Sequence, residues 1–221
     1  MKIHSRLAWL SLLFCAGLLL GMRPALALDD LYEQVTPPQP LADPSKLEVV
    51  ELFWYNCPHC YYFEPELRKW LEKRPADVAF VQVPAVFSND NWRLFAQVYY
   101  TAEALGVLEK MHTAIFEAMH KEKKSFKDEN AFMQLFEEKA NVKPENFQKE
   151  FASFAVDMKV RNAKRLTMSY GLQAVPTVIV NGKYRLTSDQ TNGSENLLKV
   201  VDQILEEARQ EKAKATKSAT P

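Results

Sequence analysis

The chain has 221 residues but only three cysteines and six glycines, and it carries no surplus of acidic or basic residues. Three cysteines are too few for the disulfide framework that stabilises many small secreted domains. The balance of 28 acidic and 28 basic residues gives no indication of nucleic-acid binding. After the first 22 residues, no segment is apolar enough to span a bilayer. The composition that remains is that of an ordinary globular domain.

The N-terminal residues have the pattern of an export signal. Lys2 and Arg6 give a positive start, residues 7–22 are mostly apolar, and residues 25–27 fit a small-x-small cleavage site. We therefore predict a signal peptide over residues 1–27 that is cleaved after Ala27. The alternative is an uncleaved membrane anchor, but the apolar run is shorter than the roughly 18 residues that usually span a membrane.

Cleavage would leave only two cysteines. Cys15 lies inside the signal, and the bulky Phe14 before it argues against lipid attachment. Three basic residues and no acidic residue leave with the signal, which gives the mature chain a net charge of −3. Export places the remaining pair, Cys57 and Cys60, in an oxidising compartment where disulfides form and persist.

The segment Cys57-Pro58-His59-Cys60 is the most informative motif. Cysteines at i and i+3 at the start of a helix lie on one face, close enough to form a disulfide without backbone movement. A purely structural disulfide is disfavoured, because closing so short a loop restricts the unfolded chain little. A zinc site would need further ligands, and the sequence has no second cysteine pair or nearby histidine cluster. We expect no metal and no other cofactor.

Thiol–disulfide exchange requires a thiolate. Cys57 at the helix start would face unpaired backbone N–H groups at the positive end of the helix dipole, which favour the ionised sulfur. His59 would add a donor or a positive charge if its ring turned toward Cys57, and Pro58 is tolerated in the first turn. We predict that Cys57 is the attacking and leaving sulfur, and that the more buried, less acidic Cys60 resolves the mixed disulfide.

Strand and helix patterns alternate around this motif. Residues 31–35 could form a short edge strand, and the proline-rich residues 36–40 an extended linker. Residues 47–55 (LEVVELFWY) are β-branched and aromatic on both faces, which predicts a central strand covered by helices on two sides. A helix over residues 57–73, kinked at Pro65, and a strand over residues 77–84 should follow.

The next 80 residues have helical periodicity only. Asp128 is expected to cap one of the helices, and residues 143–144 (Lys-Pro) to precede a long one. We expect the apolar stripes to be core. They contain Leu94, Val98, Ala102 and Leu105; Leu108, Met111, Ile115 and Met119; Phe132, Leu135 and Phe136; and Phe147, Phe151, Phe154 and Met158. His112 and His120 lie in this block, and we interpret both as surface or core residues.

Strand character returns at residues 176–180. Asn181-Gly182 predicts a hairpin to residues 183–186, and an amphipathic helix should begin near Ser194. The complete pattern predicts an α/β protein with a thioredoxin fold and an inserted all-helical domain. Its parts are residues 28–86 and 161–210 for the thioredoxin-like domain, 87–160 for the helical insertion and 211–221 for a disordered tail.

Taken together, these features show that the chain resembles the DsbA family of bacterial periplasmic dithiol oxidases. Two segments carry the resemblance most clearly, ELFWYNCPHCYYFEP and GLQAVPTVIVNGKY. The resemblance implies that the four residues of the Cys57–Cys60 motif form the active site. It also implies a cis Val175-Pro176 bond beside the motif, where Val175 and Pro176 would help to bind an extended substrate chain.

Glu51 is the polar exception in the predicted central strand, and it matches the family's buried acid beneath the active site. Such an acid could accept the proton of Cys60 during exchange. Some relatives pair this acid with a lysine on the next strand. Gln82 aligns with that position, so we expect the pair to be missing in this chain. From the strand pattern alone, Glu51 could equally be a solvated edge residue.

The resemblance implies a monomeric periplasmic oxidase that passes its disulfide to reduced, unfolded exported proteins. An integral-membrane, quinone-linked partner of the DsbB type would reoxidise it. Three alternatives stay open from sequence: an isomerase or reductase on the same scaffold, a noncatalytic chaperone-like binder, and a glutathione-dependent transferase on the related fold. An added dimerisation domain, usual among isomerases, has no room in this chain, and the intact pair of cysteines weakens the transferase.

Overall fold

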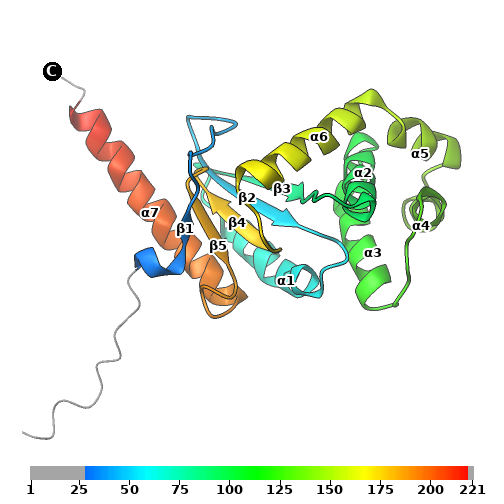
Figure 1. The fold of residues 1–221 in the computed structure, drawn as a ribbon, viewed down its shortest axis with the longest axis horizontal. Coiled ribbons are helices and arrows are strands. Elements are labelled where there is room, and N and C mark those ends of the chain that lie inside the picture. Colours follow the sequence, from blue (N-terminus) through cyan, green and yellow to red (C-terminus); the bar gives the residue numbers. More distant parts are fainter. Residues whose placement is uncertain (1–27, 219–221) are drawn as a thin grey trace, which may run out of the picture.

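The computed structural model describes residues 28–218, which form a five-stranded mixed sheet with helices around it (Figure 1). The strand order is β1-β5-β4-β2-β3. The strands are β1 (Glu33–Gln34), β2 (Leu47–Phe53), β3 (Val78–Pro84), β4 (Thr177–Val180) and β5 (Tyr184–Thr187). The helices are α1 (Pro58–Lys73), α2 (Asp90–Ala104), α3 (Leu108–His120), α4 (Glu129–Ala140), α5 (Pro144–Phe151), α6 (Phe154–Ser169) and α7 (Ser194–Ser218), after a 3-10 turn at Leu28–Leu31. The predicted signal peptide and Cys15 lie outside the described residues.

Strand β2 is the centre of the sheet. It pairs parallel with β3 and antiparallel with β4, and all seven of its residues are buried. Alternate side chains enter two different cores, as a strand covered on both faces requires. Val50 and Leu52 pack with the helical block, whereas Leu47 and Val49 pack with α1 and α7. The predicted central strand is confirmed, and its carboxyl end leads directly to Cys57.

The C-terminal hairpin is also confirmed. β4 and β5 pair antiparallel, and the turn residues Asn181 and Gly182 both have positive φ, as a tight hairpin turn requires. A Cβ atom on Gly182 would lie 2.2 Å from the carbonyl oxygen of Gln39, so only glycine fits this turn. The edge strand expected over residues 31–35 is present as the shorter β1, which pairs with β5.

Helices α2 to α6 form the block on one side of the sheet, and α7 lies on the other side (Figure 1). Asp128 caps α4 as predicted, because its side chain accepts a hydrogen bond from the N–H of Ala131. The division into a split domain and an insertion remains a prediction. Its second boundary, after residue 160, falls within α6 rather than at the end of a helix.

One predicted helix is in fact two. A single long helix would have placed Phe154 and Met158 on the buried face with Phe147 and Phe151. Instead α5 ends at Phe151, and Ser153 caps a new helix by accepting a hydrogen bond from Val156 N–H. The break changes the direction of the chain, so Phe154 is 78% exposed and Met158 48% exposed. The prediction that these two residues are core is therefore wrong.

The predicted disordered tail over residues 211–221 is wrong for residues 211–218, because α7 continues to Ser218, and its last three residues lie outside the described part of the chain. Apolar periodicity does end near residue 209, but the following segment is rich in Ala and Lys, which have high helix propensity. Two contacts also hold the helix to the body. Arg209 forms an ion pair with Asp77 at 2.7 Å, and Lys212 Nζ donates to the carbonyl oxygen of Ser45 at 2.8 Å.

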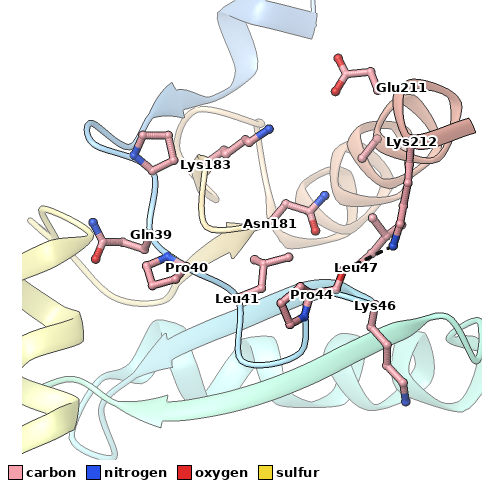
Figure 2. Close-up of a pocket in the computed structure, with 12 residues that line it drawn as sticks. Gln39, Pro40, Leu41, Pro44, Lys46, Leu47, Asn181, Lys183, Glu211 and Lys212 are labelled. Carbon is pink, nitrogen blue, oxygen red and sulfur yellow. Dashed lines mark hydrogen bonds between the residues drawn. The ribbon is translucent and has the colours of Figure 1, made fainter. Parts of the chain in front are cut away.

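A pocket lies at the start of β2, where α7 passes the linker before Leu47 (Figure 2). Its volume is about 420 Å³, and its charged lining residues include Lys46, Lys183 and Glu211. The seven-residue strand separates it from Cys57 by about 20 Å. The pocket therefore does not belong to the cysteine site. Within residues 28–218, no helix is long and apolar enough to cross a membrane.

Candidate active site

Cys57 and Cys60 lie at the start and in the first turn of α1. This helix follows β2 in the chain and begins beyond the carboxyl end of that strand. Cys57 is the N-cap residue, and its carbonyl oxygen accepts the first helical hydrogen bond from Tyr61 N–H at 3.2 Å. Its side chain caps no backbone group, so the sulfur remains available for chemistry. The two thiols are unbonded in this structure, which therefore represents the reduced form.

The surroundings shift the pKa values of the two thiols in opposite directions. The pKa of Cys57 is lowered to about 6, chiefly because the Cys60 thiol donates a hydrogen bond to its sulfur. The backbone N–H groups of Cys60 and His59 act in the same direction, while burial opposes them. Cys60 is 0% exposed, and burial raises its pKa well above the ordinary thiol value, with further contributions from Cys57 and the charge of Glu51. Cys57 is thus the acidic thiol and Cys60 the protonated one.

The other two residues of the motif, Pro58 and His59, are exposed. Pro58 occupies the first helical position, as predicted. The charge of His59 is the smallest of the causes that lower the pKa of Cys57, smaller than the contribution of the His59 backbone N–H. His59 therefore acts on the sulfur more through its backbone than through its ring.

The Val175-Pro176 bond is cis, as the resemblance implied, and it lies against the motif. The Cys57 thiol donates a hydrogen bond to the Val175 carbonyl oxygen, with a sulfur–oxygen distance of 3.3 Å. Pro176 is buried and Val175 is half-buried. The structure thus brings residues 118 positions apart in the chain into direct contact.

Glu51 is fully buried in β2, so the solvated-edge interpretation is excluded. Its pKa is raised well above the ordinary carboxyl value by burial and then by the negative charge of Glu64, while a hydrogen bond from Gln82 opposes this. Gln82 is the register partner of Glu51 on β3, and its Nε2 donates to Glu51 Oε2 at 2.7 Å. The other carboxyl oxygen, Oε1, has no hydrogen-bond partner among the described residues.

Two residues of this buried cluster, Glu64 and His112, were not found from sequence. Gln82 Nε2 also donates to Glu64 Oε1 at 3.1 Å, and His112 Nε2 lies 2.9 Å from the same oxygen. His112 Nδ1 in turn lies 2.9 Å from the hydroxyl of Tyr55. Glu64 follows Cys60 by four residues, so helical spacing could have placed it on the same face of α1. Nothing in the sequence pairs it with His112 on α3.

No group of three or more histidine, cysteine or acidic side chains within residues 28–218 is arranged to hold a metal ion. The site's own residues can support nucleophilic exchange at Cys57, with proton transfer near Cys60.

Comparison with known proteins gives a consistent result. The family model described as a DSBA-like thioredoxin domain matches residues 48–205. The thiol:disulfide interchange protein DsbA of Pseudomonas aeruginosa is 43% identical over 178 residues, which cover 80% of this chain and 83% of that protein. The protein of the same name from Burkholderia cepacia is 35% identical over 204 residues, covering 92% and 95%.

The fold agrees with this similarity. The crystal structure of Pseudomonas aeruginosa DsbA superimposes with a TM-score of 0.78 at 42% identity, covering 83% of this chain and 94% of that one. The structure of the oxidoreductase DsbA from Xylella fastidiosa gives a TM-score of 0.74 at 31% identity, covering 80% and 95%. The helical block is thus part of the shared architecture, since these matches extend over nearly the whole length of the solved chains.

Proposed function

The chain belongs to the DsbA-like thioredoxin family of thiol:disulfide oxidoreductases, and from this premise we propose that it oxidises reduced, unfolded exported proteins. The observation that carries the proposal is that the pKa values of two neighbouring thiols are shifted in opposite directions. The pKa of Cys57 is lowered to about 6, and the pKa of the buried Cys60 is raised. In a pair of this kind, the acidic thiol exchanges with the substrate and the protonated thiol resolves the mixed disulfide.

The reaction begins from the Cys57–Cys60 disulfide. A substrate thiolate attacks Cys57 Sγ, a new bond forms between the two sulfurs, and the electron pair of the broken disulfide goes to Cys60. Cys60 then takes up a proton, and we propose that it comes from Glu51, a buried acid whose charge raises the pKa of Cys60. A second substrate thiolate attacks the substrate sulfur of the mixed disulfide and expels Cys57 as a thiolate. The substrate is oxidised by two electrons, and this protein is reduced by two.

The acidity of Cys57 makes it a good leaving group and stabilises the reduced protein. Only the part of the pKa shift that lies below the ambient pH contributes to the equilibrium. At pH 7 this is about one unit, which is about 1.4 kcal/mol, or about 30 mV in a two-electron couple. The raised pKa of Cys60 adds nothing to this quantity, since Cys60 is neutral in the reduced form.

Val175 and Pro176 are proposed to receive the substrate. An extended chain whose cysteine is bonded to Cys57 would lie beside the Val175 carbonyl, which already contacts that sulfur at 3.3 Å. In the starting disulfide and in the mixed disulfide, Cys57 Sγ carries no hydrogen and cannot donate to this oxygen. The carbonyl is then free to accept a backbone N–H from the substrate, which would hold many different sequences equally well.

The remaining elements of the proposal concern compartment and partners. Residues 1–27 have the pattern of an export signal, which supports a mature protein in the periplasm. Each turnover leaves both cysteines reduced, so an external partner must take up two electrons before the next one, and for this step we propose a DsbB-type membrane reoxidase. We propose that the mature protein is a monomer.

The direct test is refolding of a reduced, disulfide-containing protein with catalytic amounts of the oxidised chain, together with the redox equilibrium against glutathione. An oxidase accelerates disulfide formation and has a potential far above that of a thioredoxin-like reductase, about −270 mV. A potential near that value would identify a reductase instead. Acceleration that survives in Cys57→Ser would identify a noncatalytic binder.

A further inference from the structure

A cluster of ionisable side chains lies beneath Cys60, and the exchange reaction uses only one of them. Glu51 and Glu64 both accept hydrogen bonds from the single amide nitrogen of Gln82, at 2.7 and 3.1 Å. Both carboxyls are buried. Two carboxylates that share one donor in a low-dielectric interior cannot both ionise without a compensating cation. The position of the proton in this cluster therefore has to be decided by what else contacts the two carboxyls.

The two carboxyls have very different surroundings. Glu64 Oε1 lies 2.9 Å from His112 Nε2, and its Oε2 lies 3.6 Å from the guanidinium of Arg68. Glu51 has only the neutral amide of Gln82, and its Oε1 has no partner within the described chain. Within the described chain, the Arg68 guanidinium and the His112 imidazole thus both contact Glu64, and neither contacts Glu51.

We propose that the Glu64–His112 pair keeps Glu64 ionised and the cluster's proton on Glu51, so that Glu51 is a neutral carboxylic acid that can donate this proton to Cys60. This role rests on the exchange function proposed above and deepens it. His112 is a positioning residue, because it acts on Cys60 only through Glu64, Gln82 and Glu51. Some relatives place a lysine on the neighbouring strand, whereas in this chain His112 from the helical block contacts the carboxyl pair, through Glu64.

The hydrogen-bond chemistry of His112 agrees with this assignment. An ionised carboxylate can only accept, so His112 Nε2 must carry a proton toward Glu64. The ionisable groups that face the pair from the packed elements are Arg68 on α1, Tyr55 after β2 and Tyr99 on α2. Burial raises the pKa of both tyrosines well above their ordinary value, so neither supplies a competing anion.

The acidities of the two carboxyls support the geometry. The pKa of Glu64 is lowered despite its burial, because the hydrogen bond and charge of His112 outweigh desolvation, with help from Arg68. The pKa of Glu51 is raised by burial and by the charge of Glu64. During exchange the Cys60 thiolate takes the proton of Glu51, and a proton from water then restores the neutral form of Glu51. When the external reoxidant proposed above removes two electrons, Cys60 loses its proton again as the disulfide forms.

Two substitutions should shift the titration of the cluster in opposite directions, which a merely structural role for the pair would not give. In Glu64→Gln the anion beside Glu51 is gone, so the highest carboxyl pKa of the cluster should fall by about one unit or more. In His112→Gln a side-chain N–H remains for Glu64 but the positive charge is lost, so that pKa should rise by a similar amount. Shifts of the same sign, or no shifts, would overturn the proposal.

The measurement is a carboxyl titration of the reduced mature protein with ¹³C-labelled glutamate, with Glu51→Gln to assign the signal. His120→Gln is the matched control, since His120 lies on the same helix and bonds the Tyr55 carbonyl at 2.7 Å without touching either carboxyl. It should shift neither signal. If the Glu64 or His112 variant fails to fold, the unaltered protein decides. One of its two buried carboxyls should titrate above the ordinary range and the other below, and two ordinary titrations would refute the assignment.

The titration needs no substrate, so it separates this proposal from the proposed function. A protein that proved not to be an oxidase could still show the two opposite shifts. An oxidase whose cluster titrates normally would retain its function, and His112 would have no part in positioning the proton.

Discussion

The two cysteines of one helical turn are surrounded in quite different ways. Cys57 is controlled locally, by the Cys60 thiol and the first N–H groups of its own helix. Cys60 lies above a cluster assembled from β2, β3, α1 and α3, whose members are up to 61 residues apart in the chain. The pKa of the reactive Cys57 is thus set by a short segment of the chain. The pKa of the resolving Cys60, in contrast, depends on residues that the whole fold brings together. Substitutions on either side of this contrast should have separable effects.

The largest effect should come from the sulfurs themselves. Cys57→Ser should abolish exchange, because no attackable disulfide can form. The matched variant Cys60→Ser also lacks the disulfide but keeps the reactive thiol Cys57 and a hydroxyl donor beside it, so it should accumulate mixed disulfides with activated substrates that Cys57→Ser cannot form. Mass spectrometry of trapped adducts measures the difference, and equal trapping by both variants would show that the two thiols are equivalent.

The next largest effect should come from Glu51, the buried acid that acts on Cys60. Glu51→Gln removes the acid beneath Cys60 and should slow oxidation of a dithiol substrate by about a hundredfold, the lower range for general acid–base catalysis. Stopped-flow kinetics of the oxidised protein with a small dithiol gives the rate. Glu48→Gln is the control, because Glu48 is buried at the other end of the same strand, where it accepts a hydrogen bond from Ala42 N–H. Unchanged kinetics in Glu51→Gln would remove Glu51 from the mechanism.

The same contrast explains which parts of the structure around the two cysteines could be predicted from the sequence. The motif at residues 57–60, the central strand before it and the Asn181-Gly182 hairpin depend on short-range patterns, and the structure confirms them. The His112–Glu64 contact joins two helices whose relative placement no local pattern specifies. The helix break at Ser153 was missed because the apolar spacing of Phe151 and Phe154 continues across it. A serine that caps a helix looks the same in sequence as one within it.

The pKa of Cys57 should reflect its local surroundings at the start of α1. The Cys57 thiolate is expected to titrate near pH 6, and its thiolate absorbance measures this directly. A lowered pKa stabilises the reduced form fully above the ordinary thiol pKa of about 9, and the effect is lost as the pH falls through 6. The redox equilibrium with glutathione, after correction for glutathione's own ionisation, should therefore lose about tenfold between pH 7 and pH 5. A thiolate titration near 9 would contradict the account of Cys57.

The smallest effect should come from His59→Ala. The contacts that dominate at Cys57, the Cys60 thiol and two backbone N–H groups, do not involve the His59 ring and remain after the substitution. The pKa of Cys57 should therefore rise by no more than about one unit. The carboxyl titration of Glu51 should not move at all, because His59 is exposed and touches no member of the buried cluster. A rise of several units would mean that the exposed imidazole, and not the helix start, makes Cys57 acidic. Movement of both titrations together would mean that the two cysteines share one electrostatic environment, and the distinction between a locally prepared and a globally prepared sulfur would fail.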